Sequence, residues 1–320
     1  MTTLKPHLPM KKSILRFPLA EVVLPFLIAA AMLTLSACNT SASSNQEQTV
    51  AYTDDYQHTV QVPVNPTRIV STSPAVTEII YALKAENLLI GRTDYCIYPP
   101  EAQSVPSIGG ISNLNVEKIV SLNPDLVISG SMIPQKSSLQ LEQMGVPIVC
   151  VIEKHRFDGL YENISKIGQL VGRTHEADSL VGLMKSQLQS LTQQLADGDT
   201  CRPSVYYVVG FGPSGNFTAG GNSFINDLIN MAGGRNIAAD ITGWSYSLEA
   251  LMQANPDYII IRREDSAAFC RTNPYNRLDA VKQGRVIGLE SGTIDLQVPR
   301  NLQAIRLLSQ RLKPTTHQDR

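Results

Sequence analysis

The chain contains one chemically suggestive pattern twice, and each copy carries an acid at the same place. Residues 115–130 read NVEKIVSLNPDLVISG, and residues 247–262 read SLEALMQANPDYIIIR. Glu117 and Glu249 each fall in the first turn of an expected helix, where the helix macrodipole stabilises a carboxylate. Because both copies keep the acid in one register, the pair also fits two symmetry-related basic patches on a dimeric partner.

Asn-Pro-Asp follows the acid in both copies, at 123–125 and at 255–257. Proline ends a helix and presets a turn, so the motif directs the chain into the strand behind it. We interpret this motif as architectural and assign it no chemistry. A module that is used twice predicts two similar lobes with a cleft between them.

Ligand binding is suggested by aromatic side chains in loops at the ends of expected strands. Open parallel sheets bind ligands outside the carboxyl ends of their strands, where aromatic rings form an apolar clamp for a large, flat ligand. For each ring, partial burial in the core is the alternative interpretation. Trp244 is the strongest candidate, because it is the single tryptophan and precedes the second copy of the repeat. The candidates are Tyr95, Tyr98, Phe217, Trp244 and Tyr246.

Patterns for catalysis, metals and nucleotides are weak in this sequence. Gly210–Gly215 reads GFGPSG and matches G-x-G-x-x-G, but Pro213 removes one amide and no helix is expected to start there. We interpret it as a glycine-rich loop lining a cleft, with an exported nucleotide-dependent enzyme as the remote alternative. His155 is interpreted as a surface residue rather than a haem ligand. We therefore expect no catalytic residue, no metal site and no cofactor.

Short apolar runs alternate with amphipathic stretches on both sides of the chain's middle, which is typical of α/β lobes with mostly parallel sheets. The length of 320 residues also suggests about two domains. The expected strands are Arg68–Ser71, Leu88–Gly91, Leu126–Ser129, Val146–Val151, Val205–Val209, Tyr258–Ile261 and Arg285–Leu289. The expected shorter helices are Thr77–Leu83, Val116–Leu122, Gln135–Met144, Ser223–Met231, Leu248–Ala254 and Pro299–Leu312.

The middle of the chain is expected to form one long helix over Thr174–Ala196. Apolar residues recur at spacings of four and three from Ala177 to Leu195, as on one face of a helix. We favour a helix that bridges the two lobes over one that seeks a coiled-coil partner, because it lies between the two copies of the repeat. The expected fold is therefore α/β, with two Rossmann-like lobes bridged by one long α-helix.

The N-terminus is typical of an export signal. Basic residues precede an apolar run over 22–35 that is shorter than a membrane span, and the LSAC sequence ending at Cys38 resembles the lipobox of bacterial lipoproteins. Cys38 is then the lipidated residue, and a polar tether follows it. The sequence leaves open whether translation starts at Met1 or at Met10. An aspartate directly after the lipidated cysteine would signal retention in the inner membrane, but this chain has Asn39 there. The lipid anchor could therefore lie in the cell membrane or in the outer membrane.

The bulk composition fits a packed globular protein, with 43% hydrophobic and 17% charged residues, and the net charge of −1 gives no basis for binding nucleic acid. The expected boundaries are a signal peptide at 1–37, a tether at 38–51, an N-terminal lobe at 52–156, a linking region at 157–201 and a C-terminal lobe at 202–320. An exported protein can form disulfides, and four further cysteines allow three pairings, with free buried thiols as the alternative. They are Cys96, Cys150, Cys201 and Cys270.

Taken together, these motifs resemble the cobalamin- and siderophore-binding proteins of ABC importers, from about Pro66 to the C-terminus. The resemblance implies a class III periplasmic binding protein that closes slightly on its ligand and delivers it to a membrane permease with ATPase subunits. YPPEA at 98–102 is more similar to the cobalamin-binding branch than to the ferric-siderophore branch. The other motifs are RIVS at 68–71, SPAVTE at 73–78, the two glutamate copies and AGGRN at 232–236.

Position by position, the resemblance implies four corrinoid-contacting residues and two acids that dock on permease arginines. These are Ala75, Tyr95, Phe217 and Trp244 for the ligand, and Glu117 and Glu249 for the permease. Ile111 stands where cobalamin binders have an aromatic residue, and we expect it to line the ligand site as well. A second family aromatic falls at Gly130, and 291–296 lack the family's acid and arginine contacts. The departures leave cobalamin or a related corrinoid, haem and a ferric siderophore open. Haem would favour a tyrosine or histidine on iron, and a siderophore several arginines in the cleft.

Overall fold

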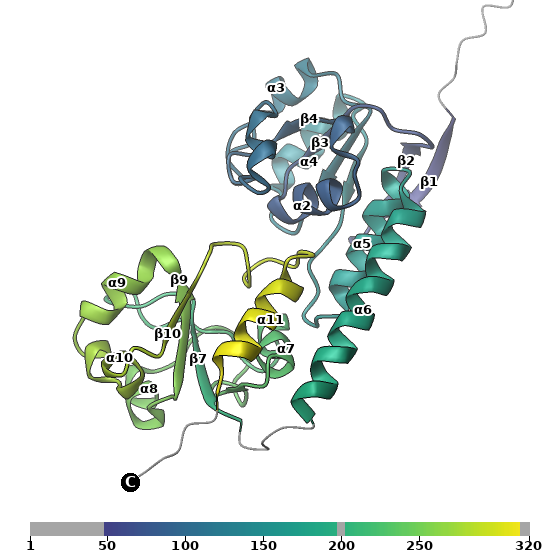
Figure 1. Cartoon of the computed structure of the whole chain (residues 1–320). Coiled ribbons are helices and arrows are strands. Elements are labelled where there is room, and N and C mark those ends of the chain that lie inside the picture. The colour runs from purple at the N-terminus through teal and green to yellow at the C-terminus, as the bar shows by residue number, and fades with distance from the viewer. Residues whose placement is uncertain (1–47, 197–201, 314–320) are drawn as a thin grey trace, which may run out of the picture. The chain divides into compact units, whose positions relative to one another are not determined.

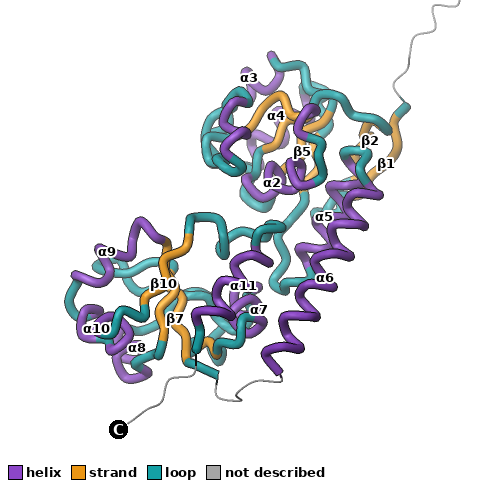
Figure 2. The backbone as a smooth tube through the Cα atoms, viewed as in Figure 1, coloured by secondary structure: helices purple, strands orange, loops and turns teal. Residues whose placement is uncertain are grey.

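The computed structural model describes residues 48–196 and 202–313, so the expected lipidation site Cys38 and the thiol of Cys201 lie outside the described residues. Within those ranges the chain forms two four-stranded parallel sheets and one two-stranded antiparallel hairpin (Figures 1 and 2). None of the described helices is long and apolar enough to cross a membrane.

The N-terminal lobe is built on the sheet β4-β3-β5-β6, and all of its pairings are parallel. Its strands are β3 (Ile69–Ser71), β4 (Leu89–Arg92), β5 (Leu126–Ser129) and β6 (Ile148–Cys150). Its helices are α2 (Pro74–Ala82), α3 (Val116–Ser121) and α4 (Gln135–Gln143), with 3-10 turns η2 (Glu86–Leu88) and η3 (Pro100–Ser104). α2 begins three residues before the expected start, because Pro74 itself takes the first helical position.

The C-terminal lobe is built on the parallel sheet β10-β9-β7-β8. Its strands are β7 (Ser204–Val208), β8 (Arg235–Asn236), β9 (Tyr258–Arg262) and β10 (Val286–Leu289). Its helices are α7 (Phe224–Met231), α8 (Leu248–Ala254), α9 (Arg263–Arg271), α10 (Asp279–Lys282) and α11 (Asn301–Arg311), with a 3-10 turn η4 (Tyr275–Arg277). The sequence pattern missed β8, α9 and α10, because each is too short or too polar to show a period.

The two lobes share one topology, which confirms the inference drawn from the repeat. In each sheet the first strand in sequence lies between the second and the third, and the fourth pairs with the third. β5 and β7 are buried along their whole length, as expected for parallel strands covered on both faces.

The Asn-Pro-Asp motifs have the architectural role that we expected. Asn123 and Asn255 end their helices with φ angles of 50° and 38°. Asparagine tolerates this left-handed conformation better than most residues that carry a side chain. The motif therefore stops each helix at a fixed residue before the next strand.

The aspartate of each motif fastens the start of the neighbouring first strand. Asp125 accepts hydrogen bonds from the amide of Thr67 at 2.6 Å and of Arg68 at 3.1 Å, just before β3. Asp257 accepts from the amide and the hydroxyl of Ser204, each at 2.7 Å, at the start of β7. In each lobe, therefore, the aspartate of the repeated motif connects the start of one strand to the start of the neighbouring strand.

A hairpin precedes the N-terminal lobe and was not expected. β1 (Thr49–Thr53) pairs with β2 (Thr59–Pro63), so the tether predicted to reach residue 51 is corrected to end before Thr49. The turn is closed by Asp54, whose Oδ1 accepts from the amides of Tyr56 and His58, both at 2.9 Å. An aspartate that bonds to amides ahead of it is a common turn-forming device.

The predicted long helix is confirmed as α6 (Thr174–Ala196), but a second helix, α5 (Gly159–Leu170), lies against it (Figure 1). A Cβ at Gly168 would lie 2.5 Å from the Cβ of Ala177, so the glycine permits close helix packing. α6 also contacts α11, and its Leu195 lies over Gly233 of the C-terminal lobe. The apolar stripe is therefore covered within the chain rather than by a coiled-coil partner.

The three described cysteines are free thiols. Cys96 and Cys150 are buried, and burial raises the pKa of both, that of Cys150 to about 11. A thiol with a raised pKa is a poor nucleophile and a poor metal ligand. These two side chains therefore act as small apolar core residues.

Candidate functional site

A cavity of about 350 Å³ is lined by loops of both lobes. The N-terminal lobe contributes the turns after β3, β5 and β6, and the C-terminal lobe contributes the start of α7, the Trp244 loop and the segment after β10. Most of these segments follow the carboxyl ends of parallel strands, where such sheets bind ligands. The lining residues are Thr72, Ser73, Pro74, Ile111, Gly130, Ser131, Met132, Ile133, Glu153, Lys154, His155, Ser223, Phe224, Trp244, Asp295 and Leu296.

The turn between β3 and α2 is held rigid by short side chains. Ser71 donates its hydroxyl to the carbonyl of Ser73 at 3.0 Å, and Thr77 donates to the hydroxyl of Ser71 at 2.9 Å. Ala75, an expected ligand contact, is buried directly behind this turn and does not line the cavity. Its neighbours Thr72, Ser73 and Pro74 form this part of the wall instead.

Gly130 forms the second wall because no side chain fits there. A Cβ at Gly130 would lie 2.8 Å from Oγ of Ser73 and 2.9 Å from its Cβ. The aromatic residue that the resemblance places at this position is therefore excluded by the β3–α2 turn. Its absence widens the cavity at the end of β5.

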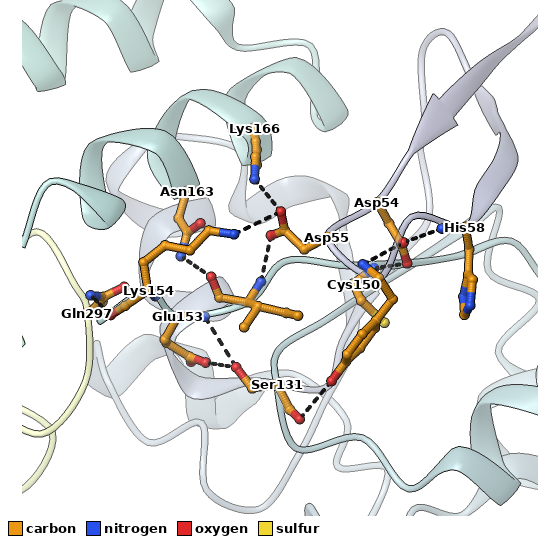
Figure 3. A network of polar contacts seen from close by, with 12 residues as sticks. Asp54, Asp55, His58, Ser131, Cys150, Glu153, Lys154, Asn163, Lys166 and Gln297 are labelled. Atoms are coloured by element: carbon orange, nitrogen blue, oxygen red, sulfur yellow. Dashed lines mark hydrogen bonds and ion pairs between the residues drawn. The ribbon is translucent and has the colours of Figure 1, made fainter. Parts of the chain in front are cut away.

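The third wall is the segment after β6, which is polar and is hydrogen-bonded to the segment after β5. Ser131 and Glu153 form a short hydrogen bond, and the amide of Glu153 donates to Oγ of Ser131 at 3.2 Å (Figure 3). The amide of Lys154 donates to Oε1 of Gln297 at 2.9 Å, which joins this wall to the C-terminal lobe. His155 follows, exposed at the cavity.

The C-terminal wall presents Trp244, whose side chain is 49% exposed. Its carbonyl accepts from the amide of Thr218 at 2.7 Å, and a bridge between Phe217 and Ser245 continues the same backbone pairing. The pairing holds Phe217 next to the tryptophan loop, with 38% of its side chain exposed. A rigid loop therefore holds two exposed rings near the cleft.

The glycine-rich loop serves this pairing and not a nucleotide. Phe217 pairs with Gly210, and a Cβ at Gly221 would lie 1.9 Å from the carbonyl oxygen of Ala239. A dinucleotide fold needs a helix that starts at the third glycine, Gly215, but the next helix starts at Phe224. The geometry required by the nucleotide hypothesis is missing from this part of the chain.

The remaining aromatic candidates, Tyr95, Tyr98 and Tyr246, are not among the lining residues of the cavity, but Tyr95 lies next to one of them. Tyr95 is 62% exposed, and its ring lies 3.7 Å from where Gly110 would carry a Cβ, beside the cavity-lining Ile111. The guanidinium of Arg300 lies over the ring of Tyr98, at 4.3 Å from the centroid, and Tyr98 is 38% exposed away from the cavity lining. Tyr246 packs on Tyr206 with ring centroids 5.7 Å apart. Tyr98 and Tyr246 therefore lie outside the cavity lining.

Sequence reasoning missed several lining residues, chiefly Met132, Glu153 and Asp295. Met132 and Glu153 each come three residues after the end of a strand, β5 or β6, so the rule that ligands bind at strand carboxyl ends identifies them once the strands are known. Asp295 lies in an irregular segment with no periodic signal. Only the fold brings it to the cavity.

The charges around the cavity are mainly negative. Glu153 and Asp295 contribute carboxylates, and among the described residues no arginine lines the cavity. Lys154 is the one lysine of that lining, and its ammonium pairs with Asp55 at 3.1 Å. An anionic ligand would therefore meet uncompensated acids, whereas donors such as amides would find acceptors.

A buried ion pair joins the lobes beside the cavity. Nε of Arg300 lies 2.9 Å from Oε2 of Glu78, and Nη2 lies 2.7 Å from Oε1. Both side chains are less than a tenth exposed. Burial raises the pKa of Glu78 to about 7, although Arg300 lowers it. The pair links α2 to the segment before α11.

Glu117 and Glu249 are both exposed in the first turns of α3 and α8. Asn115 caps α3 by accepting from the amide of Lys118 at 2.8 Å, and Ser247 caps α8 in the same way at 3.0 Å. Neither glutamate forms an ion pair within residues 48–196 and 202–313. Both carboxylates are free to meet an outside partner.

Comparison with known proteins agrees with this geometry. The family described as periplasmic binding protein matches residues 69–293. The chain is 30% identical over 307 residues to an uncharacterised ABC transporter substrate-binding lipoprotein of Bacillus subtilis (strain 168), covering 92% of this chain and 96% of the relative. It is 29% identical over 264 residues to a cobalamin-binding protein of Halobacterium salinarum, covering 78% of this chain and 70% of that protein.

A solved structure shows the same fold. The chain is similar to a periplasmic haem-binding protein from Pseudomonas aeruginosa with a TM-score of 0.71 and 26% identity, covering 78% of this chain and 94% of that one. The expected α/β fold with parallel sheets is confirmed. The relatives' names agree on the class of protein and differ in the ligand.

Proposed function

We propose that this chain, which belongs to the periplasmic binding protein family, carries cobalamin or a related corrinoid to an ABC importer. Its work is capture, partial closure and handover. These steps make and break no covalent bond, so we assign no catalytic residue and no resident cofactor. The ligand is held in the cavity between the two sheets.

The observation that carries the ligand assignment is the chemistry of the cavity. Its walls combine apolar groups, such as Ile111, Leu296 and Trp244, with the carboxylates of Glu153 and Asp295. A corrinoid offers a broad ring system with peripheral amides, whose N–H groups donate to carboxylates. Haem carries propionates and ferric siderophores are commonly anionic, so each would favour unpaired cations, whereas the one lysine of this lining is paired with Asp55. Apolar stacking would supply most of the affinity, and the acids the orientation.

Haem is the second candidate, because two side chains at the cavity are suitable iron ligands. Met132 is 71% exposed, and His155 lines the same cavity. Histidine and methionine are both axial ligands of haem iron in other proteins. In this case the propionates would have to point away from Glu153 and Asp295.

The docking surface would be formed by Glu117 and Glu249, one at the exposed start of a matching helix in each lobe. The partner would be a permease dimer with its ATPase subunits, which offers two symmetry-related basic patches. Exposed charges of this kind set orientation and the rate of encounter more than affinity. A lipid on Cys38 would hold the protein to the cell membrane or to the outer membrane, facing the periplasm or the exterior.

The ligand assignment is tested by titrating the soluble chain, without Cys38 and its leader, with cyanocobalamin, haemin and a ferric siderophore. Calorimetry and the emission of Trp244 report binding. We expect saturable 1:1 binding of the corrinoid, and about tenfold weaker binding after Trp244→Ala, because stacking on the ring is lost.

Tyr246→Phe is the matched control, since its ring packs on Tyr206 away from the cavity. Its affinity should equal that of the wild type. Absence of heat and of quenching with cyanocobalamin would overturn the corrinoid assignment. Saturable binding of haemin, lost in His155→Ala, would replace it with the haem assignment.

A further inference from the structure

The turn between β1 and β2 places the carboxylate of Asp55 behind the cavity wall, next to the buried Asp54. Asp55 has a side chain that is 9% exposed, and its Oδ1 pairs with the ammonium groups of Lys154, at 3.1 Å, and Lys166 (Figure 3). Its Oδ2 accepts from the amide of Ile152 at 2.8 Å. One aspartate therefore binds two lysines and the backbone that leads into the cavity wall.

The main chain of Lys154 is fixed, so the direction of its ammonium depends on Asp55. The amide of Lys154 donates to Gln297, and Gln297 donates back to its carbonyl at 2.7 Å. The first carbons of the side chain lie over Gly159, where a Cβ would be 2.3 Å from the Cβ of Lys154. Beyond those carbons the chain can rotate, and the bond to Asp55 selects one direction.

The hairpin is also attached to Ser131 in the adjoining segment after β5, which keeps Asp55 in register. The hydroxyl of Tyr56 donates to the carbonyl of Ser131 at 3.3 Å, and the amide of Asp55 donates to the carbonyl of Cys150 at 3.1 Å. Burial raises the pKa of Asp55, but the bonds from Lys166, Ile152 and Lys154 outweigh it and lower the pKa overall. The carboxylate is therefore ionised at neutral pH.

We propose that Asp55 is a specificity-determining residue that sets the charge preference of the cavity. By holding the ammonium of Lys154, the only lysine among the described lining residues, it leaves the carboxylates of Glu153 and Asp295 as the available charges. The cavity then favours a ligand with neutral amides over the same ligand bearing a carboxylate. The inference rests on the proposed corrinoid function and extends it to a residue that does not touch the ligand.

The test compares two ligands that differ by one charge, cyanocobalamin and the monocarboxylate formed when one peripheral amide is hydrolysed. In the wild type the amide form should bind more tightly. Asp55→Asn should lower this preference about fivefold, since it frees the partly exposed ammonium of Lys154 at the cavity, and such pairs contribute about 1 kcal/mol. It also frees the ammonium of Lys166, which is not among the lining residues. Asp55→Asn/Lys154→Gln should restore the wild-type ratio. Asp178→Asn, an equal charge change on the exposed face of α6, is the matched control.

An unchanged ratio in folded Asp55→Asn, or a shift that persists in the double variant, would overturn the proposal. If Asp55→Asn fails to fold, the single variant Lys154→Gln tests the proposal instead. That variant should leave the ratio unchanged, and a selective loss of the carboxylate form would show that Lys154 already serves the cavity. If neither corrinoid binds the wild type, the proposed function itself fails, which is a distinct result.

Discussion

The two copies of the repeated phrase agree at one end and differ at the other. Both begin with a capped helix that carries an exposed glutamate, and both turn through an asparagine in the left-handed region. In both, an aspartate then fastens the first strand of the sheet. The part that the two copies share, from the helix cap to the aspartate, therefore stabilises each lobe and holds an exposed glutamate at its surface.

The strands that follow lead to different surroundings. β5 ends at Gly130, where Ser73 leaves no room for a side chain and the cavity begins. β9 ends at Arg262, which pairs with Asp265 at 2.8 Å as α9 starts at once, and contributes nothing to the cavity lining. The cavity therefore begins where the two copies stop matching, at the end of the first copy, and not in the part that they share.

The largest effect is expected from a contact that belongs to neither copy, the ion pair between Glu78 and Arg300. Arg300→Met should lower the free energy of unfolding by about 3–5 kcal/mol, because it leaves a buried carboxylate without its partner. Denaturant unfolding measures this value. In Glu78→Met/Arg300→Met most of the stability should return, since no buried charge is left unpaired. An equal loss in the single and the double variant would contradict this account.

The pH dependence of the same pair follows from the raised pKa of Glu78, about 7 against 4.5 for the free side chain. Between pH 4.5 and pH 7, Glu78 therefore holds its proton more tightly in the folded state than in the unfolded state. The stability contributed by Glu78 is therefore present at low pH and is lost as the pH rises through 7. The difference in unfolding free energy between wild type and Glu78→Gln should shrink from pH 4.5 to pH 7, and growth over that range would contradict the assignment.

A smaller loss of stability is expected when the aspartate of either Asn-Pro-Asp motif is replaced, and the loss should differ between the two lobes. Asp257 is buried, and Asp257→Ala leaves the amide and hydroxyl of Ser204 without this acceptor, at a cost of about 3 kcal/mol. Asp125 is only partly buried, so water can replace it and Asp125→Ala should cost about 1 kcal/mol. Unfolding curves of the two variants provide the comparison. Equal losses would mean that the motif works in the same way in both lobes despite the difference in burial.

The sequence predicted the lobes, the long helix and the architectural motifs because each rests on a local signal. The αL asparagines and the α6 stripe are signals of this kind. The position of Asp55 and the place of Asp295 depend on contacts between segments far apart in the chain, for which no local pattern exists. Tyr98 shows the same limit, since the ring of this loop tyrosine lies under the guanidinium of Arg300, about two hundred residues away in the chain.

We infer that the matched glutamates serve the transporter and that the unmatched loops serve the ligand. The most direct measurement is importer-dependent uptake by Glu117→Gln/Glu249→Gln, with ligand affinity measured on the same protein. We predict unchanged affinity, a stability change of no more than about 1 kcal/mol from the helix dipoles, and loss of uptake. Wild-type uptake, or a collapse of ligand affinity in this variant, would contradict the claim.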